Sequence, residues 1–314
     1  MRPISDDAHR REAHYNAKVT EAIDVHTELR ILRVRPDAWP LEFTPGQYTV
    51  LGLGAWEPCS LGTSASPRAN QDAGDKLIQR AYSFAGPLLD SEGRLVRTAD
   101  CPFLEFYLTL VPGGPNHPPG LTPRLFRLAP GDRLFVGPHP HGRYTLVPLA
   151  GDESIVFVAT GTGEAPHNAM LAELLASHHR GSVTSVTCVR RRYDLAYLAT
   201  HRELERRYAN YRYMAITTRE PENLDPAAPG YVGKRYLQDY VESGAFERER
   251  GVTLSPHWSH VYLCGSPAMV GLPEHSPSGL RYPRPKGMVE VLEARGFVLD
   301  HADQPGNIHY ERYW

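Results

Sequence analysis

Short alternating runs of hydrophobic and polar residues, separated by Gly and Pro, occupy the chain from about residue 19 to residue 149. A period of two indicates β-strands with one buried face, and many short strands with Gly/Pro turns are typical of an antiparallel barrel. This half contains almost no helical pattern. The runs that carry the prediction are TELRILRV, FTPGQYTVLGL, AYSF, LEFYLTLV and GDRLFVG.

The pattern changes at residue 154. SIVFVAT is a continuous apolar run of the kind found in buried parallel strands, and HNAMLAELLASHH after it has helical spacing. The alternation continues with the segments SVTSVTCV, DLAYLATHRELERRYA, YMAITT, KRYLQDYVESG, HVYLCG and GMVEVLEARG. Strands alternating with helices predict a doubly wound parallel sheet, which binds ligands at the carboxyl ends of its strands.

This change in the pattern of hydrophobic and polar residues predicts two domains. A chain of 314 residues is long enough for two hydrophobic cores. We place the boundary near residues 150–153 and predict an antiparallel β-barrel domain over 14–150 and an α/β domain over 151–314.

Composition narrows the functional classes. A net charge of -2, with 22% charged residues, gives no general attraction to nucleic acid or anionic membranes, so neither is expected as a partner. No apolar run approaches the roughly 20 residues of a membrane span, and the polar start of the chain does not resemble a signal peptide. We expect a cytoplasmic protein.

The four cysteines lie far apart, at the positions Cys59, Cys101, Cys188 and Cys264. This spacing provides no CxxC metal site and no iron–sulfur motif. We therefore expect no metal in this chain, and any electron-carrying cluster must belong to another protein.

Candidate ligand contacts follow two of the predicted parallel strands. Gly161-Thr162-Gly163 lies between SIVFVAT and the next helix, where glycines allow close approach and helix N–H groups attract phosphate. Cys264-Gly265 ends a later strand, and a thiol there can contact a cofactor ring without adding charge. The turn lacks the GxGxxG spacing and the Walker lysine, so its position carries most of the argument.

In the first half, RAYSFAGP combines a cation, an aromatic ring and a hydroxyl. A strand directs Arg80 and Tyr82 to one face and Ser83 to the other. These groups suit a ligand with phosphates and a flat heteroaromatic ring. An edge strand with a solvated Arg and a half-buried Tyr is the alternative for this stretch alone.

Several motifs in one order resemble bacterial ferredoxin (flavodoxin)–NADP reductase. They are RAYS, LEFYL at 104–108, LTPRL at 121–125, ATGTGEAP at 159–166, TTRE at 217–220, YLCG, and Tyr313-Trp314. The resemblance covers the chain from about Val19 onward. It implies an FAD-binding antiparallel barrel followed by an NADP-binding α/β domain, which is the architecture that the hydrophobic pattern predicts.

The resemblance also implies roles around FAD. Within the Arg80-Ala81-Tyr82-Ser83 motif, Arg80 would hold the pyrophosphate, Tyr82 would lie on one isoalloxazine face, and Ser83 would donate a hydrogen bond near the reactive flavin nitrogen. The other residues of the expected FAD site are Tyr107, Gly120, Leu121, Thr122, Tyr313 on the second flavin face, and Trp314 on the adenine. A plain helix N-cap is the alternative role for Thr122.

Cations after neighbouring strands indicate the form of nicotinamide cofactor. Arg190, Thr218 and Arg219 follow two predicted strands, and Lys234 precedes a helix. If the strands are adjacent, these groups converge on a patch suited to the 2'-phosphate of NADP. Arg191 and Arg192 are expected to be solvated, and Arg235 is an alternative to Lys234.

The predicted activity is electron exchange between NADP(H) and a separate ferredoxin or flavodoxin through FAD. Thr162, Gly163, Cys264 and Gly265 would adjoin the nicotinamide, and the expected catalytic contacts are Tyr82, Ser83, Cys264 and Tyr313. Two alternatives stay open: an NAD(P)H-dependent free-flavin reductase, and an electron-transfer subunit of a larger complex.

Overall fold

In the computed structural model the chain forms two compact units, Met1–Thr145 and Leu146–Trp314. The structure describes residues 6–59, 74–113, 120–276 and 279–313. Among these residues, no helix has the length and apolar character needed to cross a membrane.

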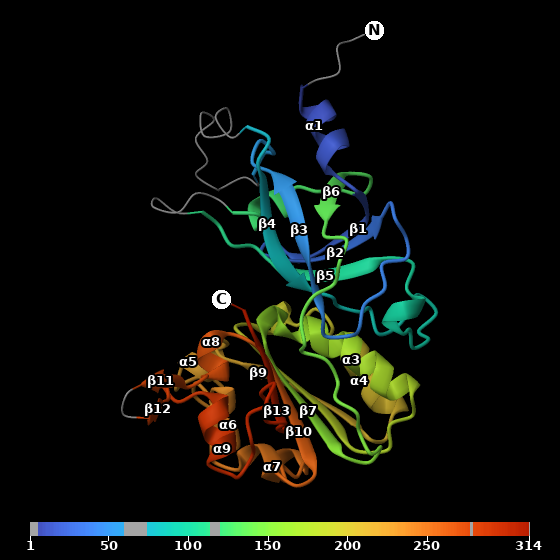
Figure 1. Ribbon diagram of the computed structural model, residues 1–314. Coiled ribbons are helices and arrows are strands. Elements are labelled where there is room, and N and C mark those ends of the chain that lie inside the picture. The colour runs from blue at the N-terminus through green and yellow to red at the C-terminus, as the bar shows by residue number, and fades with distance from the viewer. Residues whose placement is uncertain (1–5, 60–73, 114–119, 277–278, 314) are drawn as a thin grey trace. The chain divides into compact units, whose positions relative to one another are not determined.

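The first unit is built on a six-stranded antiparallel sheet (Figure 1). Its strand order is β4-β3-β6-β1-β2-β5. Short helices accompany the strands. The elements are α1 (Asp6–His14), β1 (Ala17–His26), β2 (Leu29–Pro36), β3 (Tyr48–Gly54), β4 (Leu77–Ser83), η2 (Thr98–Asp100), β5 (Leu104–Thr109), α2 (Thr122–Leu125) and β6 (Arg133–Val136).

A backbone contact joins the two edges of this sheet. Ala85, two residues after β4, forms an antiparallel bridge with Glu105 of β5, and the Ala85 N–H donates to the Glu105 carbonyl at 2.9 Å. Because β4 and β5 are the edge strands, the bridge closes the sheet into a barrel. Alternate side chains of each strand, such as Leu104, Phe106 and Leu108, fill its core.

Helix α1 was not predicted from the sequence. It is held by Glu57, whose two carboxylate oxygens accept hydrogen bonds from the Arg11 guanidinium at 2.7 Å. The Tyr15 hydroxyl also donates to Glu57 and accepts from the Gly54 N–H, each at 2.9 Å. The helix contains no apolar side chain larger than alanine, so these contacts, rather than an apolar stripe, fix its position.

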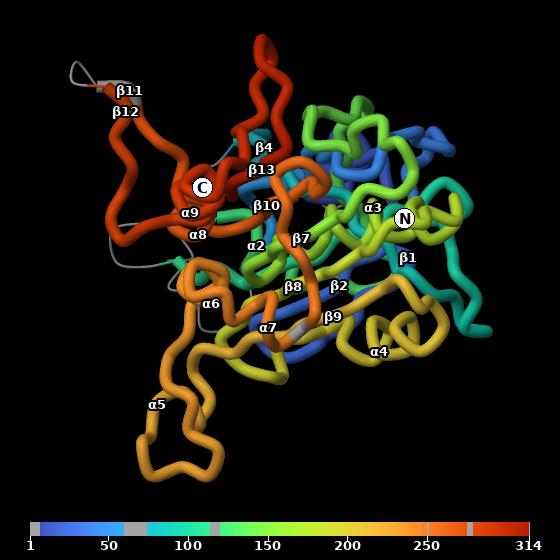
Figure 2. Tube along the Cα trace, turned by 90° about the horizontal axis from the view of Figure 1, so that it is seen from below, coloured from blue at the N-terminus to red at the C-terminus, as the bar shows by residue number. Residues whose placement is uncertain are grey.

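The second unit contains a five-stranded parallel sheet with the order β13-β10-β7-β8-β9 (Figure 2). The chain starts in the middle with β7, proceeds through β8 to β9, and then crosses to β10 and β13 on the other side. The elements are β7 (Ser154–Thr160), η3 (Gly161–Gly163), α3 (Glu164–Ala176), β8 (Val183–Val189), η4 (Arg192–Asp194), α4 (Leu198–Arg207), β9 (Tyr211–Thr217), α5 (Pro221–Leu224), α6 (Leu237–Glu242), α7 (Ala245–Arg250), β10 (Ser259–Gly265), α8 (Pro267–Val270), the hairpin β11 (Glu274–Ser276) and β12 (Gly279–Arg281), α9 (Met288–Glu293) and β13 (Ile308–Arg312).

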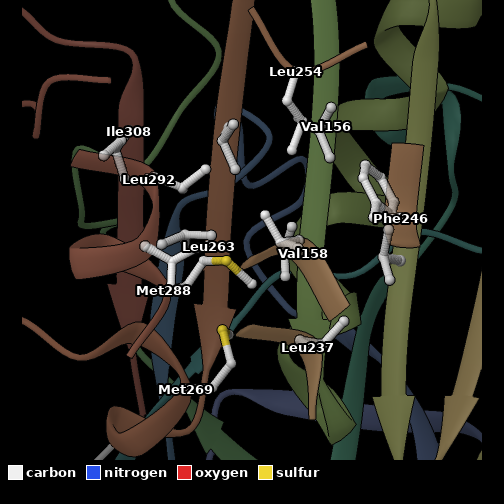
Figure 3. Close-up of a cluster of buried hydrophobic side chains, with 14 of the residues drawn as sticks. Val156, Val158, Leu237, Phe246, Leu254, Leu263, Met269, Met288, Leu292 and Ile308 are labelled. Carbon is white, nitrogen blue, oxygen red and sulfur yellow. The ribbon is translucent and has the colours of Figure 1, made fainter. Parts of the chain in front are cut away.

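Helices cover both faces of this sheet, as expected for buried strands. Helices α3 and α4 lie on one face, and α6 and α9 lie on the other (Figure 1). Figure 3 shows the second of these interfaces, where Val156 and Val158 of β7 and Leu263 of β10 meet Met288 and Leu292 of α9. The intervening Phe157 points to the opposite face, where its ring stacks on His167 of α3 at 4.9 Å.

Candidate functional site

The strand order reverses between β7 and β10, and the loops after these two strands lie against each other. A Cβ on Gly163 would overlap the Cys264 carbonyl, and a Cβ on Gly265, whose φ is +126°, would overlap Thr160. The Thr160 hydroxyl accepts a 2.7 Å hydrogen bond from the Ser266 N–H. Ligands of open α/β sheets bind at this point, so the two loops form the first part of the candidate site.

The glycines of the first loop therefore have different roles. Gly163 allows the two loops to touch, whereas Gly161, with φ +53°, has no neighbouring atom within 4 Å of where its Cβ would be. Thr162 between them is half-buried. The loop leads directly into the 13-residue helix α3, whose first N–H groups can attract a phosphate. This geometry fits the close approach of a nucleotide.

Cys264 is fully buried at the end of β10. The side chain of Tyr313 hydrogen-bonds to its thiol, and burial raises the pKa of the thiol well above its usual range. The Tyr313 N–H donates to the Gly265 carbonyl at 2.8 Å, which fixes this residue beside the loop. The structure thus brings Cys264, Gly265 and Tyr313 together, with the tyrosine against the thiol. Trp314 lies outside the described residues.

A cationic patch follows the neighbouring strands β8 and β9, which pair in parallel. The Arg219 N–H donates to the Arg190 carbonyl at 2.8 Å, and Thr218 lies between Arg219 and the end of β9. Both arginine side chains are exposed, and no ion pair holds either of them within the described residues. The Thr218 hydroxyl is buried and donates to the Val189 carbonyl at 3.3 Å, so the two guanidinium groups are the part of the patch that suits a phosphate.

The next two arginines lie beside carboxylates. Arg192 is exposed, as predicted for a solvated side chain, and Arg191 is half-buried. Arg192 pairs with Glu222 at 2.9 Å, and Arg191 lies 3.9 Å from Glu220. Glu220 also accepts a hydrogen bond from the Arg192 N–H. The two carboxylates neutralise these neighbours, so the charge of the patch comes from Arg190 and Arg219.

Lys234 lies in a segment that a buried asparagine connects to the patch. Asn223 accepts hydrogen bonds from the Thr217 hydroxyl at 3.1 Å and the Glu220 N–H at 3.0 Å, and it donates to the Gly233 carbonyl at 3.3 Å. Sequence reasoning missed Asn223, although its place at the third residue of α5, after Glu220, is a capping signal.

The side chains of Lys234 and Arg235, the two cations predicted for this segment, have different surroundings. The Lys234 ammonium lies 5.2 Å from the centre of the Tyr236 ring, which is 43% exposed, whereas Arg235 pairs with Glu249 at 3.7 Å. Lys234 is therefore the better candidate of the two for an anion. Tyr236, which sequence reasoning also missed, offers an exposed face on which a base can stack.

In the first unit, the RAYS motif forms the second half of the edge strand β4, which pairs with β3. Arg80 and Ala81 are exposed, Tyr82 is half-buried and Ser83 is buried. The Arg80 guanidinium contacts only its neighbour's backbone, the Gln79 carbonyl, at 2.7 Å among the hydrogen bonds of the described residues. Burial raises the pKa of the Tyr82 phenol, and the charge of Arg80 opposes this shift. An exposed cation beside a ring fits a ligand with phosphates and an aromatic system.

The remaining predicted FAD contacts come from β5 and α2. Tyr107 and Leu121 are buried, while Gly120 and Thr122 are half-buried. The N-cap of α2 is Leu121, so the alternative of a plain N-cap at Thr122 is wrong. The Thr122 hydroxyl instead accepts a 2.9 Å hydrogen bond from the Val111 N–H. Among the described residues, no neighbouring atom lies within 4 Å of a Cβ built on Gly120.

Across the described ranges, no group of three or more His, Cys, Asp or Glu side chains is placed to hold a metal. The candidate site described above consists of arginines, hydroxyls, aromatic rings, a thiol and backbone N–H groups. These groups can bind phosphates and stack on planar rings.

Comparisons with known proteins agree with this geometry. Residues 157–274 match the family model of the oxidoreductase NAD-binding domain. The flavodoxin/ferredoxin–NADP reductase of Escherichia coli (strain K12) is 32% identical over 231 residues, which are 73% of this chain and 77% of that protein. The same figures hold for the Shigella flexneri protein of that name. A crystal structure of a ferredoxin NADP+ reductase from Neisseria gonorrhoeae with bound FAD and NADP has a TM-score of 0.67 at 19% identity, covering 95% of this chain and 97% of that one.

Proposed function

Because this chain belongs to the flavodoxin/ferredoxin–NADP reductase family, we propose that it exchanges electrons between NADP(H) and a separate ferredoxin or flavodoxin through FAD. The observation that carries the proposal is the pair Arg190 and Arg219 at the carboxyl edge of the parallel sheet, which are linked through their backbones and form no ion pair with any described residue. A 2'-phosphate needs such a pair, and NAD does not.

The residues of the second unit would bind and align the nicotinamide cofactor. Arg190, Thr218, Arg219 and Lys234 would hold the 2'-phosphate. Thr162 and the start of α3 lie at the strand-order reversal, where the pyrophosphate and nicotinamide would approach. The Tyr313 side chain hydrogen-bonds to the Cys264 thiol, so a nicotinamide ring in contact with this thiol would displace the Tyr313 side chain.

The residues of the first unit would bind FAD. The Arg80 guanidinium is free to pair with the pyrophosphate, the Tyr82 ring can exclude water from one face of the flavin, and Ser83 and Tyr107 supply hydroxyls. When bound, FAD accepts or gives two electrons with the nicotinamide and one at a time with the carrier protein. No residue of this chain needs to act as a general base for that exchange.

The absorbance spectrum of the purified protein, with NADPH-dependent reduction of ferredoxin and of flavodoxin, tests the proposal. We expect bound flavin in near-equimolar amount and carrier reduction that is faster with NADPH than with NADH. A protein that purifies without flavin and releases reduced free flavin would instead be a flavin reductase. An isolated chain that cannot oxidise NADPH with an artificial dye would be a subunit of a larger complex.

The choice between ferredoxin and flavodoxin, and a cytoplasmic location, stay predictions. Reduction rates with purified ferredoxin and with purified flavodoxin would identify the partner. The physiological carrier should be reduced faster and should also form the tighter complex. Cell fractionation would test the location.

A further inference from the structure

Glu164, the first residue of α3, lies buried directly after the Gly161–Gly163 turn. One of its carboxylate oxygens, Oε1, accepts three hydrogen bonds: from the Thr187 hydroxyl at 3.0 Å, the Tyr213 hydroxyl at 2.9 Å and the His201 Nε2 at 3.0 Å. Neither the proposed cofactor contacts nor the hydrophobic core explains a carboxylate at this position.

The groups that hydrogen-bond to Glu164 do not neutralise a negative charge on its carboxylate. The other ring nitrogen of His201 lies 2.8 Å from the Tyr211 hydroxyl, so a neutral imidazole can accept from the tyrosine and donate to Glu164. His201 is completely buried. An oxygen that accepts three hydrogen bonds suits an ionised carboxylate, and no arginine or lysine pairs with Glu164 in the described ranges.

The second carboxylate oxygen, Oε2, is buried and has no hydrogen-bond partner in the part of the chain that the structure describes. A buried anion with half of its oxygens unsatisfied costs stability. The three donors account for Oε1, but they do not account for Oε2. The cost suggests that the charge has a use at the adjoining site.

We propose that Glu164 is a buried anion that favours binding of the oxidised, cationic nicotinamide ring over the reduced, neutral ring. The inference rests on the proposed NADP site, in which Thr162 adjoins the nicotinamide. Glu164 is two residues from Thr162, so its carboxylate lies on the order of 10 Å from a ring held there. Coulomb's law at that distance, with an effective dielectric of about 20 to 40, corresponds to a factor of about 4 to 16 in a dissociation constant.

Both ligands carry the same phosphates, so the ratio of their dissociation constants reports the charge of the ring. The test titrates the FAD-loaded protein by calorimetry with NADP+ and with tetrahydro-NADP, a neutral-ring analogue that cannot donate hydride. Glu164→Gln keeps the volume and the accepting oxygen, and Glu164→Met removes the charge with an apolar side chain. In both variants we expect the preference for NADP+ over the analogue to fall about 4- to 16-fold.

Glu173→Gln is the matched control, because it removes the same charge from the same helix more than two turns away from the loop. It should leave the ratio within about twofold of the original protein. Thr187→Val removes one donor but no charge and should also preserve the ratio. Thermal melts and flavin content establish that each variant is folded.

The outcomes separate this inference from the proposed function. A folded Glu164→Gln or Glu164→Met protein with an unchanged ratio overturns the role of Glu164, as does an equal fall in Thr187→Val. If the original protein binds neither NADP+ nor 2',5'-ADP, the proposed NADP site itself is wrong.

Discussion

Replacing Arg219 with alanine should damage the use of NADPH and spare the use of NADH. In the structure the Arg219 backbone is fixed to Arg190 by a 2.8 Å hydrogen bond, while its exposed guanidinium forms no ion pair with any described residue. The substitution therefore removes a phosphate contact without exposing a former protein partner. Hydrogen bonds to charged groups contribute about 1.5–3 kcal/mol, which corresponds to about a 10- to 150-fold rise in KM for NADPH.

The assay is steady-state dye reduction at fixed ionic strength, with NADPH and NADH compared for each variant. Arg192→Ala is the matched control, because this arginine already pairs with Glu222. We expect the control to change the NADPH/NADH preference by less than about threefold. An equal loss with both nicotinamides in Arg219→Ala, or an equal effect in the control, would refute the 2'-phosphate assignment.

Three further substitutions test other parts of the proposal. Arg80→Ala should weaken FAD binding about 10- to 100-fold by removing a charge-assisted pyrophosphate contact, and normal flavin content after dialysis would exclude Arg80 from the site. Tyr313→Ser should narrow the NADPH-over-NADH preference, because the nicotinamide no longer has to displace a ring; if the preference ratio of this variant equals that of the original protein, the gating role is wrong. Burial lowers the pKa of His167 to about 3. As pH falls below about 6.5, the unfolded chain therefore takes up a proton at this histidine before the folded chain does. The free energy of unfolding that is present at pH 7 declines toward pH 3. In denaturant unfolding, the original protein should lose about 2 kcal/mol more free energy of unfolding between pH 7 and pH 5 than the His167→Phe variant. Equal losses in the two proteins would contradict the lowered pKa of His167.

Much of the architecture could be predicted from the sequence because most elements have a simple local pattern of apolar residues. SIVFVAT, SVTSVTCV and HVYLCG are continuous apolar runs, and they became β7, β8 and β10 of the parallel sheet. The barrel strands were recognisable from alternation and Gly/Pro punctuation. Helix α1 was missed because it has no apolar stripe, and its contact Glu57 lies more than 40 residues away in sequence.

In the candidate site, too, contacts between residues far apart in the sequence could not be predicted. The adjacency of Arg190 and Arg219 could be predicted, since it requires only that two strands be neighbours. The pairing of Arg191 and Arg192 with Glu220 and Glu222 could not, because it depends on how the chain turns after β9. The Glu164 network was equally hidden: its partners come from β8, β9 and α4, and no local spacing brings them together.

The contact between the loops after β7 and β10 has a consequence for how this protein can evolve. Gly163 and Gly265 admit no side chain, so the backbone around the proposed nicotinamide position has little freedom to vary. Arg190 and Arg219 are exposed, and substitutions of exposed side chains usually change stability by less than about 0.5 kcal/mol. If these arginines bind the 2'-phosphate as proposed, lineages that descend from such a protein can exchange one nicotinamide coenzyme for the other by surface mutations, while the backbone of the proposed nicotinamide position is inherited unchanged.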